Sequence, residues 1–248
     1  MCERCGQGLS HRFTPSRRGL LLGASAMLMS GIARAKEDRK DRKESKKPPK
    51  PQNVVSPEVA LERLKQGNER YVEGIARRHD FRHEREALAS GQNPYAAILG
   101  CADSRIAPEF AFDTGRGDLF VCRVAGNFAN PESVASLEYA VSVLATPLIL
   151  VLGHDACGAV DATIKSLKDN TTLPGHLPSL VEGLAPAVKA VSGQAGDGLA
   201  NAIKQNVIDT VATLKSATPI LSAAADQGKL KVAGGIYRLG SGKVDMVA

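Results

Sequence analysis

Three short apolar runs constrain the fold of this chain more than any other feature of its sequence. They are Tyr95–Gly100, Leu119–Val124 and Leu148–Leu152, and a segment with helical character, Pro131–Leu144, lies between the second and the third. Runs of this length without polar alternation are typical of strands buried on both faces, and such strands occur in parallel sheets that helices cover. The sequence therefore predicts an α/β fold with a mostly parallel central sheet flanked by helices.

The predicted domain opens with a helix. The segment Ser56–Glu58 supplies a capping serine and then a proline in the first turn, and an apolar face follows at helical spacing. This face contains Ala60, Leu64, Gly67 and Tyr71. A helix that follows a polar linker must bury such a face on its own domain or on a partner. We therefore expect an N-terminal helical arm that contributes to assembly.

The second half of the domain is predicted to contain two long helices and a hairpin. The helices cover Cys157–Leu167 and Asn201–Leu214, and the glycine-rich, polar stretch 169–198 between them is predicted to be a loop with one short helix. The hairpin runs from Leu230–Leu239 through a Gly-Ser-Gly turn into Val244–Val247.

The N-terminal segment resembles an export signal. Ser16-Arg17-Arg18-Gly19-Leu20-Leu21 matches a twin-arginine (Tat) signal, and the apolar run that follows ends at Ala33-Arg34-Ala35, a small-x-small cleavage site. This run is shorter than the ~20 residues that a spanning helix needs, so we expect no stable membrane span. Residues 1–35 are predicted to engage the Tat machinery and to be cut off after Ala35, which would leave a periplasmic or secreted protein.

A basic linker, residues 36–55, follows the predicted signal. Its residues 36–53, KEDRKDRKESKKPPKPQN, offer no apolar side chain except prolines for a core. Residues 1–50 contain 13 Lys/Arg and 5 Asp/Glu, so the net charge of +6 of the whole chain leaves residues 51–248 at −2. The positive charge belongs to the signal and the linker. We therefore expect no nucleic-acid binding by the folded domain, residues 56–248.

The five cysteines divide along the same boundary. Cys2 and Cys5 would leave with the signal, so three cysteines remain in the mature chain. An odd number in an oxidising compartment argues against a disulfide framework. Cys122 lies inside an apolar run and is predicted to be a core residue. The question is then what occupies the thiols of Cys101 and Cys157.

Metal-competent residues follow two of the predicted strands. The first apolar run leads into CADSR, residues 101–105, and the third leads into GHDACG, residues 153–158. Because the carboxyl ends of parallel strands meet at one edge of a sheet, we expect Cys101, His154 and Cys157 to converge. Two thiolates and one imidazole are the ligand set of a zinc site with one position open for water. The sequence therefore predicts one Zn²⁺ per subunit.

Asp103 and Arg105 are predicted to assist the metal. With one residue between Cys101 and Asp103, the carboxylate can lie beside the open position and accept a hydrogen bond from water, while Arg105 orients it. The alternatives are a cysteine that only fills the core, a plain ion pair, His154 as a helix cap, and a purely structural zinc site, although structural sites usually have four Cys or His ligands. The remaining histidines of the domain are expected to be solvated: His79, His83 and His176.

The motifs CADSR, GDLFVCRVAGN, SLEYAV and GHDACGAV, in this order and spacing, resemble those of the β-class carbonic anhydrases over roughly Ser56 to Val247. The resemblance implies reversible hydration of carbon dioxide to bicarbonate and a proton, by attack of zinc-bound hydroxide. It implies that the three predicted ligands bind the zinc and that Asp103 and Arg105 form the catalytic pair. It also implies that Asp103 becomes a fourth ligand in a closed state only.

The resemblance extends to the substrate pocket. Gln92, nine residues before the first cysteine of CADSR, matches a residue that hydrogen-bonds the substrate. Phe120 and Tyr139 match aromatic residues of the pocket wall, and Gly126-Asn127 matches the loop over the metal. The family pocket lies at a dimer interface, so the resemblance implies a homodimer or a higher homo-oligomer.

One position departs from the pattern of some bacterial members. They hold an inhibitory bicarbonate with a tryptophan three residues before the first zinc cysteine, whereas this chain has Ile98 there and no tryptophan at all. Two alternative functions are a hydrolase of carbonyl sulfide or carbon disulfide on the same fold, and a non-catalytic zinc-stabilised binding protein. The pair of Asp103 and Arg105 favours an enzyme, because a structural site needs no oriented carboxylate beside an open position.

Overall fold

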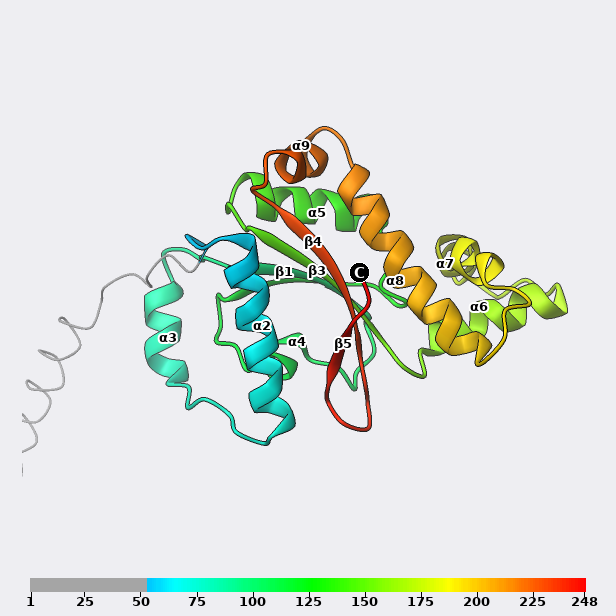
Figure 1. The fold of residues 1–248 in the computed structure, drawn as a ribbon, viewed down its shortest axis with the longest axis horizontal. Coiled ribbons are helices and arrows are strands. Elements are labelled where there is room, and N and C mark those ends of the chain that lie inside the picture. Colours follow the sequence, from blue (N-terminus) through cyan, green and yellow to red (C-terminus); the bar gives the residue numbers. More distant parts are fainter. Residues whose placement is uncertain (1–52) are drawn as a thin grey trace, which may run out of the picture. The chain divides into compact units, whose positions relative to one another are not determined.

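A computed structural model describes residues 53–248 of the chain. The predicted signal peptide with Cys2 and Cys5, and residues 36–52 of the predicted linker, lie outside the described residues. The described domain contains one sheet with helices on both faces (Figure 1). No helix in this part of the chain is long and apolar enough to cross a bilayer.

The sheet has five strands in the order β2-β1-β3-β4-β5. The strands are β1 (Ala96–Gly100), β2 (Leu119–Arg123), β3 (Leu148–His154), β4 (Lys231–Tyr237) and β5 (Val244–Met246). The first four are parallel to their neighbours, and β5 pairs antiparallel with β4 as the second strand of the predicted hairpin. The predicted α/β fold is therefore confirmed.

The central strands are buried because helices cover both of their faces. Every residue of β1 and β3 is buried, as their unbroken apolar sequences predict. One face lies under α2 (Pro57–Val72) and α4 (Pro108–Ala111). The other face is covered by α5 (Pro131–Ser142), α6 (Gly158–Asp169), α7 (Pro178–Ala190), α8 (Gly198–Ser216) and α9 (Ile220–Asp226).

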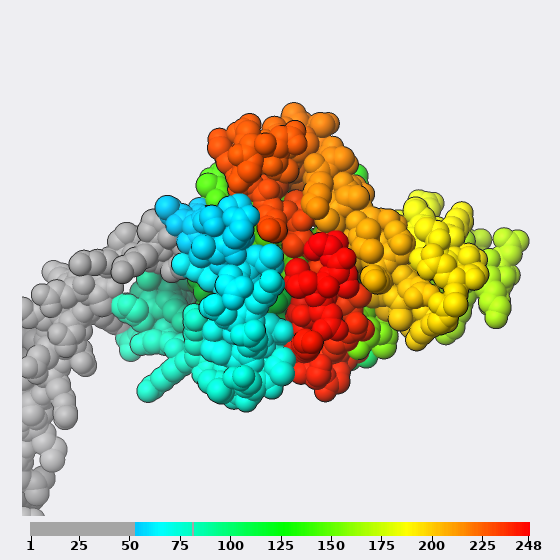
Figure 2. Space-filling view, viewed as in Figure 1, coloured from blue at the N-terminus to red at the C-terminus, as the bar shows by residue number. Residues whose placement is uncertain are grey.

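Helix α2 packs on the sheet of its own chain. Its N-cap is Ser56, whose hydroxyl accepts a hydrogen bond from the backbone N–H of Val59 at 3.3 Å. Ala60 and Leu64 are buried in the core under the sheet, whereas Tyr71 is partly exposed. Figure 2 shows α2 and β5 side by side on one face of the domain, where they line a common groove. The predicted helix is confirmed, and most of its apolar face is used within the domain.

Three short helices were not predicted, and a fourth helix is longer than predicted. Helix α3, Phe81–Leu88, has the sequence FRHEREAL, which lacks an extended apolar period, so only its capping residue Asp80 marks it in the sequence. Helices α4 and α9 are too short for a periodic pattern. Helix α7 has 13 residues, more than the short helix predicted in the stretch 169–198.

Two predictions on single side chains need correction. His79 is half-buried, with its Nδ1 2.9 Å from Glu84 Oε1, so the prediction that it is solvated was wrong. His83 and His176 are exposed, as predicted. Cys122 packs against the core but is only half-buried, because it lies on the edge strand β2.

Candidate metal centre

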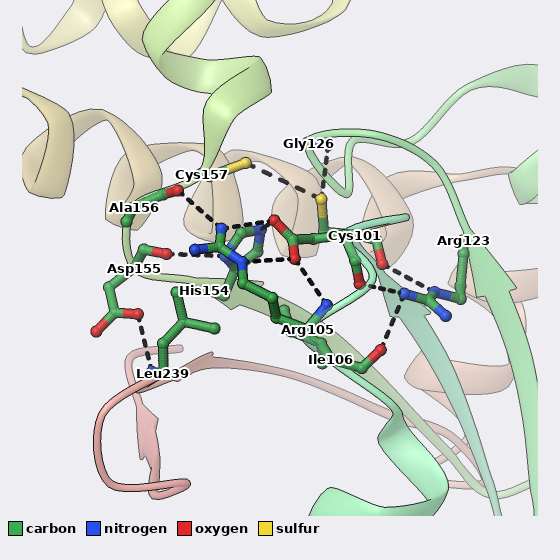
Figure 3. A network of polar contacts seen from close by, with 11 residues as sticks. Cys101, Arg105, Ile106, Arg123, Gly126, His154, Asp155, Ala156, Cys157 and Leu239 are labelled. Atoms are coloured by element: carbon green, nitrogen blue, oxygen red, sulfur yellow. Dashed lines mark hydrogen bonds and ion pairs between the residues drawn. The ribbon is translucent and has the colours of Figure 1, made fainter.

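Three buried side chains converge at the carboxyl ends of β1 and β3. Cys101 follows the last residue of β1, His154 is the last residue of β3, and Cys157 is the N-cap residue of α6. One ligand atom from each lies within 4.8 Å of the other two (Figure 3). Strand β3 is two residues longer than predicted, so the sheet itself fixes the backbone of His154.

The imidazole of His154 presents a bare nitrogen to the two thiols. Its Nδ1 lies 2.8 Å from the carbonyl oxygen of Asp155. A carbonyl can only accept, so Nδ1 carries the hydrogen and donates it. The other nitrogen, Nε2, is fully buried and has no hydrogen-bond partner. A buried lone pair without a donor is costly, and a metal ion would satisfy it.

The two thiols of the cluster also lack a partner that would let both of them ionise. Their sulfur atoms are 4.0 Å apart. The hydrogen bond from Cys157 lowers the pKa of Cys101 to about 4, although burial alone would raise it. Conversely, the Cys101 sulfur and burial raise the pKa of Cys157 far above its ordinary value. The pair therefore ionises fully only with a nearby positive charge, which a divalent cation supplies. These donors fit Zn²⁺ well.

The loop Gly126-Asn127 lies over the sulfur of Cys101. The backbone N–H of Gly126 donates to this sulfur at 3.3 Å. Gly126 has a φ of +85°, and a Cβ there would come within 2.7 Å of Leu184, so this close approach requires glycine. From α8, the amide of Asn206 donates to the Gly126 carbonyl at 2.7 Å. Asn127 is also buried.

Asp103 and Arg105 form a tight pair beside this cluster. The backbone N–H and Nε of Arg105 donate to Asp103 Oδ1, both at 2.9 Å, and its Nη2 donates to Oδ2 at 2.7 Å. The hydrogen bonds from Arg105 hold the pKa of Asp103 well below its usual range. Asp103 Oδ2 lies 3.9 Å from His154 Nε2. An ionised, oriented carboxylate therefore lies next to the three donor atoms.

The other residues predicted to line the substrate pocket lie away from the cluster of Cys101, His154 and Cys157. Gln92 is exposed and precedes the amino end of β1. Phe120 lies three residues before the carboxyl end of β2, about 10 Å along a strand. The centroid of its ring is 6.2 Å from that of Tyr139 on α5. The side chain of Tyr139 is 47% exposed. One chain therefore does not bring these three residues to its own ligand cluster.

The sequence analysis did not single out Arg123, which contacts the turn between Cys101 and Ile106. The signal was present in the sequence, since Arg123 is a charged residue at the end of an apolar run. A single strand-end arginine is nevertheless too common a feature to indicate a role without its contacts.

The fold and the site define a β-class carbonic anhydrase, and comparisons with known proteins agree. Residues 96–244 match the family model described as carbonic anhydrase, and the chain belongs to this family. Carbonic anhydrase 2 of Mycobacterium tuberculosis is 42% identical over 192 residues, which are 76% of this chain and 91% of the relative. The carbonic anhydrase of Mycolicibacterium smegmatis is 38% identical over 193 residues, 77% of this chain and 93% of that protein.

A solved structure supports the same family assignment as these two relatives. The β-carbonic anhydrase CcaA superposes with a TM-score of 0.59 at 30% identity, over 76% of this chain and 98% of that one. The chain is therefore an enzyme that catalyses the reversible hydration of carbon dioxide to bicarbonate, and its cofactor is zinc. The predicted class, reaction and metal are confirmed.

Proposed function

We propose that Cys101, His154 and Cys157 hold the zinc ion of this carbonic anhydrase, and that Asp103 and Arg105 are its catalytic pair. The observation that carries this assignment is the convergence of three buried donor atoms around an imidazole nitrogen that has no hydrogen-bond partner. Three protein ligands leave one position of a tetrahedral zinc site open, as catalysis requires.

A zinc ion held by these three residues would act as a Lewis acid and would make water nucleophilic near neutral pH. The residues of the chain then orient the reaction. Asp103 Oδ2 lies 3.9 Å from His154 Nε2, so its carboxylate could accept a hydrogen bond from a water molecule held at the remaining position and would orient that water. Arg105 keeps the carboxylate ionised and holds it beside the donor atoms through its Nε and Nη2.

The same carboxylate could also occupy the open position itself. In that closed arrangement Asp103 would be a fourth ligand and would exclude water from the site. The hydrogen bonds from the side chain of Arg105 oppose this rotation, because both would be lost. Arg105 therefore sets the balance between the two arrangements.

Metal content and carbon dioxide hydration, measured together on the full chain, test the ligand assignment. The hydration rate should fall when a chelator removes the metal and return as Zn²⁺ is added, up to one ion per chain. His154→Ala should weaken this response to added zinc. Hydration that persisted in fully metal-free protein, or a second zinc needed for full activity, would contradict the assignment.

We further propose that a second copy of the chain completes each pocket. Among the strands of residues 53–248, β2 lies at the edge of the sheet and pairs with β1. If two copies paired their β2 strands antiparallel about a two-fold axis, the amino end of one strand would lie beside the carboxyl end of the other. This arrangement would carry Phe120 and Tyr139 toward the ligand cluster of the neighbouring copy. Gln92, also on the amino-end side, would approach the same cluster.

Mixed dimers test this arrangement. Gln92→Ala and Asp103→Ala are each expected to weaken activity, and unfolding and refolding the two variants together should restore about a quarter of the parent activity. The reason is that random mixing makes half of the dimers hybrid, and each hybrid contains one site with both residues intact. If Gln92 served its own chain, hybrid dimers would contain no intact site and activity would not rise.

We also propose Tat-dependent export, with a mature chain that starts at Lys36 and uses residues 36–55 as a basic linker to the zinc domain. The motif around Arg17-Arg18 and the site Ala33-Arg34-Ala35 support this proposal. Zinc would also protect the two ligand thiols from periplasmic oxidation. Replacing Arg17 and Arg18 by lysine should retain the protein in the cytoplasm. Periplasmic protein of mature size in that variant would refute the proposal.

A further inference from the structure

We propose that Arg123 is a positioning residue, which fixes the turn that carries Asp103 and Arg105. Arg123 is the last residue of β2, and its register partner is Gly100, the last residue of β1. The turn from Cys101 to Ile106 therefore begins directly beside it. This inference rests on the proposed catalytic role of Asp103 and extends it to a residue that lies outside the catalytic pair.

The guanidinium of Arg123 binds three carbonyl groups of this turn (Figure 3). Its Nε donates to the carbonyl oxygen of Cys101 at 2.9 Å. Its Nη2 donates to the carbonyl of Asp103 at 2.6 Å and to that of Ile106 at 2.9 Å. The start, the middle and the end of the turn are thus held by one planar cation, so these three backbone groups cannot move independently.

Arg123 connects the turn to the sheet. The turn is closed within itself by the hydrogen bond from Ile106 N–H to the carbonyl of Asp103 at 3.2 Å. A backbone hydrogen bond from Ala102 N–H to the carbonyl of Val124, also 3.2 Å, is one link of the turn to the backbone beyond β2. Arg123 adds three charge-assisted hydrogen bonds to that link, and such bonds are about twice as strong as neutral ones.

The position of this backbone decides where the carboxylate of Asp103 lies. An aspartate side chain has only two torsion angles, so once its backbone is fixed its carboxylate reaches few places. In this structure it reaches a place 3.9 Å from His154 Nε2. Each hydrogen bond of the Arg123 guanidinium goes to a backbone carbonyl rather than to a ligand sulfur or the imidazole. Losing Arg123 should therefore misplace Asp103 while the metal ligands keep their side chains.

Two substitutions at Arg123 separate positioning from charge. Arg123→Met removes all three hydrogen bonds and keeps an unbranched apolar stem. Arg123→Lys keeps the charge but cannot reproduce the fork between Nε and Nη2. We expect both variants to hold close to one zinc per chain. The kcat of the methionine variant should fall by up to about 100-fold, the typical cost of a ~1 Å misplacement, and the lysine variant should lie between it and the parent.

Arg82→Met is the matched control. Arg82 is exposed on α3, and its Nε lies 4.0 Å from Glu86 Oε1. This variant makes the same chemical change at a surface position away from the turn, so its kcat and KM should stay within about twofold of the parent values.

A double-mutant cycle with Asp103→Ala distinguishes positioning from a general structural role. If Arg123 acts through Asp103, Arg123→Met should add less than about threefold to the loss already caused by Asp103→Ala, since residues that act as a unit are not additive. If the two losses multiply, or if Arg123→Lys loses its zinc, the inference is refuted. Should the methionine variant fail to fold, the same cycle with Arg123→Lys decides. An Asp103→Ala variant as active as the parent would instead refute the proposed catalytic pair.

Discussion

The two ends of the sheet differ in whether one chain brings its predicted site residues together. At the carboxyl ends of the strands, Cys101, His154 and Cys157 are buried and lie within 4.8 Å of one another. On the amino-end side, Gln92 is exposed and Tyr139 is 47% exposed, and neither joins the cluster. The sheet of one chain therefore brings together the donors of the proposed metal site, whereas it leaves the residues matched to the substrate pocket away from that site.

The burial and the contacts of the side chains differ between the two ends in the same way. Among the donors of the proposed metal site, the buried Nε2 of His154 has no hydrogen-bond partner, and an ion would relieve the cost of burying it. Phe120 and Tyr139 pack against each other on an edge strand and the helix that follows it, and both keep exposed aromatic surface. Exposed aromatic residues next to an unpaired strand edge are typical of a protein interface. These properties favour a metal ion at one end of the sheet and support the proposal of a partner chain at the other.

The largest expected effect lies at the metal site. Cys157→Ala removes one of three ligands, so zinc should be lost and carbon dioxide hydration should fall to the background rate. Cys122→Ala is the control, because this half-buried thiol lies outside the ligand cluster and should leave the zinc content unchanged. Metal analysis beside rate measurement checks both variants. One tightly bound zinc in Cys157→Ala would contradict the ligand assignment.

A smaller effect is expected at the carboxylate beside the metal site. Asp103→Ala should keep its zinc, because the three other donors remain, and should lose roughly 10²–10⁴ in kcat/KM, as other acid–base residues do. The measurement is the rate per bound zinc. Equal rates per zinc in the parent and the variant would leave Asp103 without a catalytic role.

The pH dependence tests Arg105. Its hydrogen bonds lower the folded-state pKa of Asp103, so the stabilisation they provide is present above the unfolded-state pKa of about 3.9 and is lost as the pH falls toward the folded value. In Arg105→Ala the pKa of Asp103 should rise, and the freed carboxylate should compete for the open metal position. Both effects move the acid limb of kcat/KM to higher pH. An acid limb at the parent position would show that Arg105 does not control the carboxylate.

The smallest effect on folding is expected on the amino-end side. Tyr139→Ala truncates a side chain that is 47% exposed and packs against Phe120 of the same chain, so the free energy of unfolding of the monomer should fall by only about 0.5–1.5 kcal/mol, the value of an aromatic pair. The dimer should dissociate at a higher protein concentration, because the aromatic contact at its interface is removed. Denaturant unfolding of the dilute monomer and sedimentation of the concentrated protein measure the two effects separately. A large loss of monomer stability with unchanged dimer affinity would show that Tyr139 supports the fold of the monomer and not the dimer interface.

The parts of the fold that could be predicted from sequence carry strong local patterns. β1 and β3 are buried apolar runs, and the hairpin of β4 and β5 turns at Gly240-Ser241-Gly242. Helix α3 was missed because its eight residues FRHEREAL are mostly charged or polar. His79 was placed in solvent because its partner Glu84 lies across the start of that same helix. A missed element therefore also led to a wrong environment for its neighbour.

By itself, the sequence determined that two cysteines and a histidine follow two buried strands, and this is sufficient to predict a zinc site because parallel strands end at one edge of a sheet. Only the tertiary structure showed that Arg123 contacts the turn beside that site. The register of β2 against β1 places Arg123 opposite Gly100, within hydrogen-bond distance of three carbonyls of the turn that carries Asp103. A shift of one residue would turn this side chain to the other face of the sheet. Strand register depends on the packing of whole faces, so a local pattern cannot specify it.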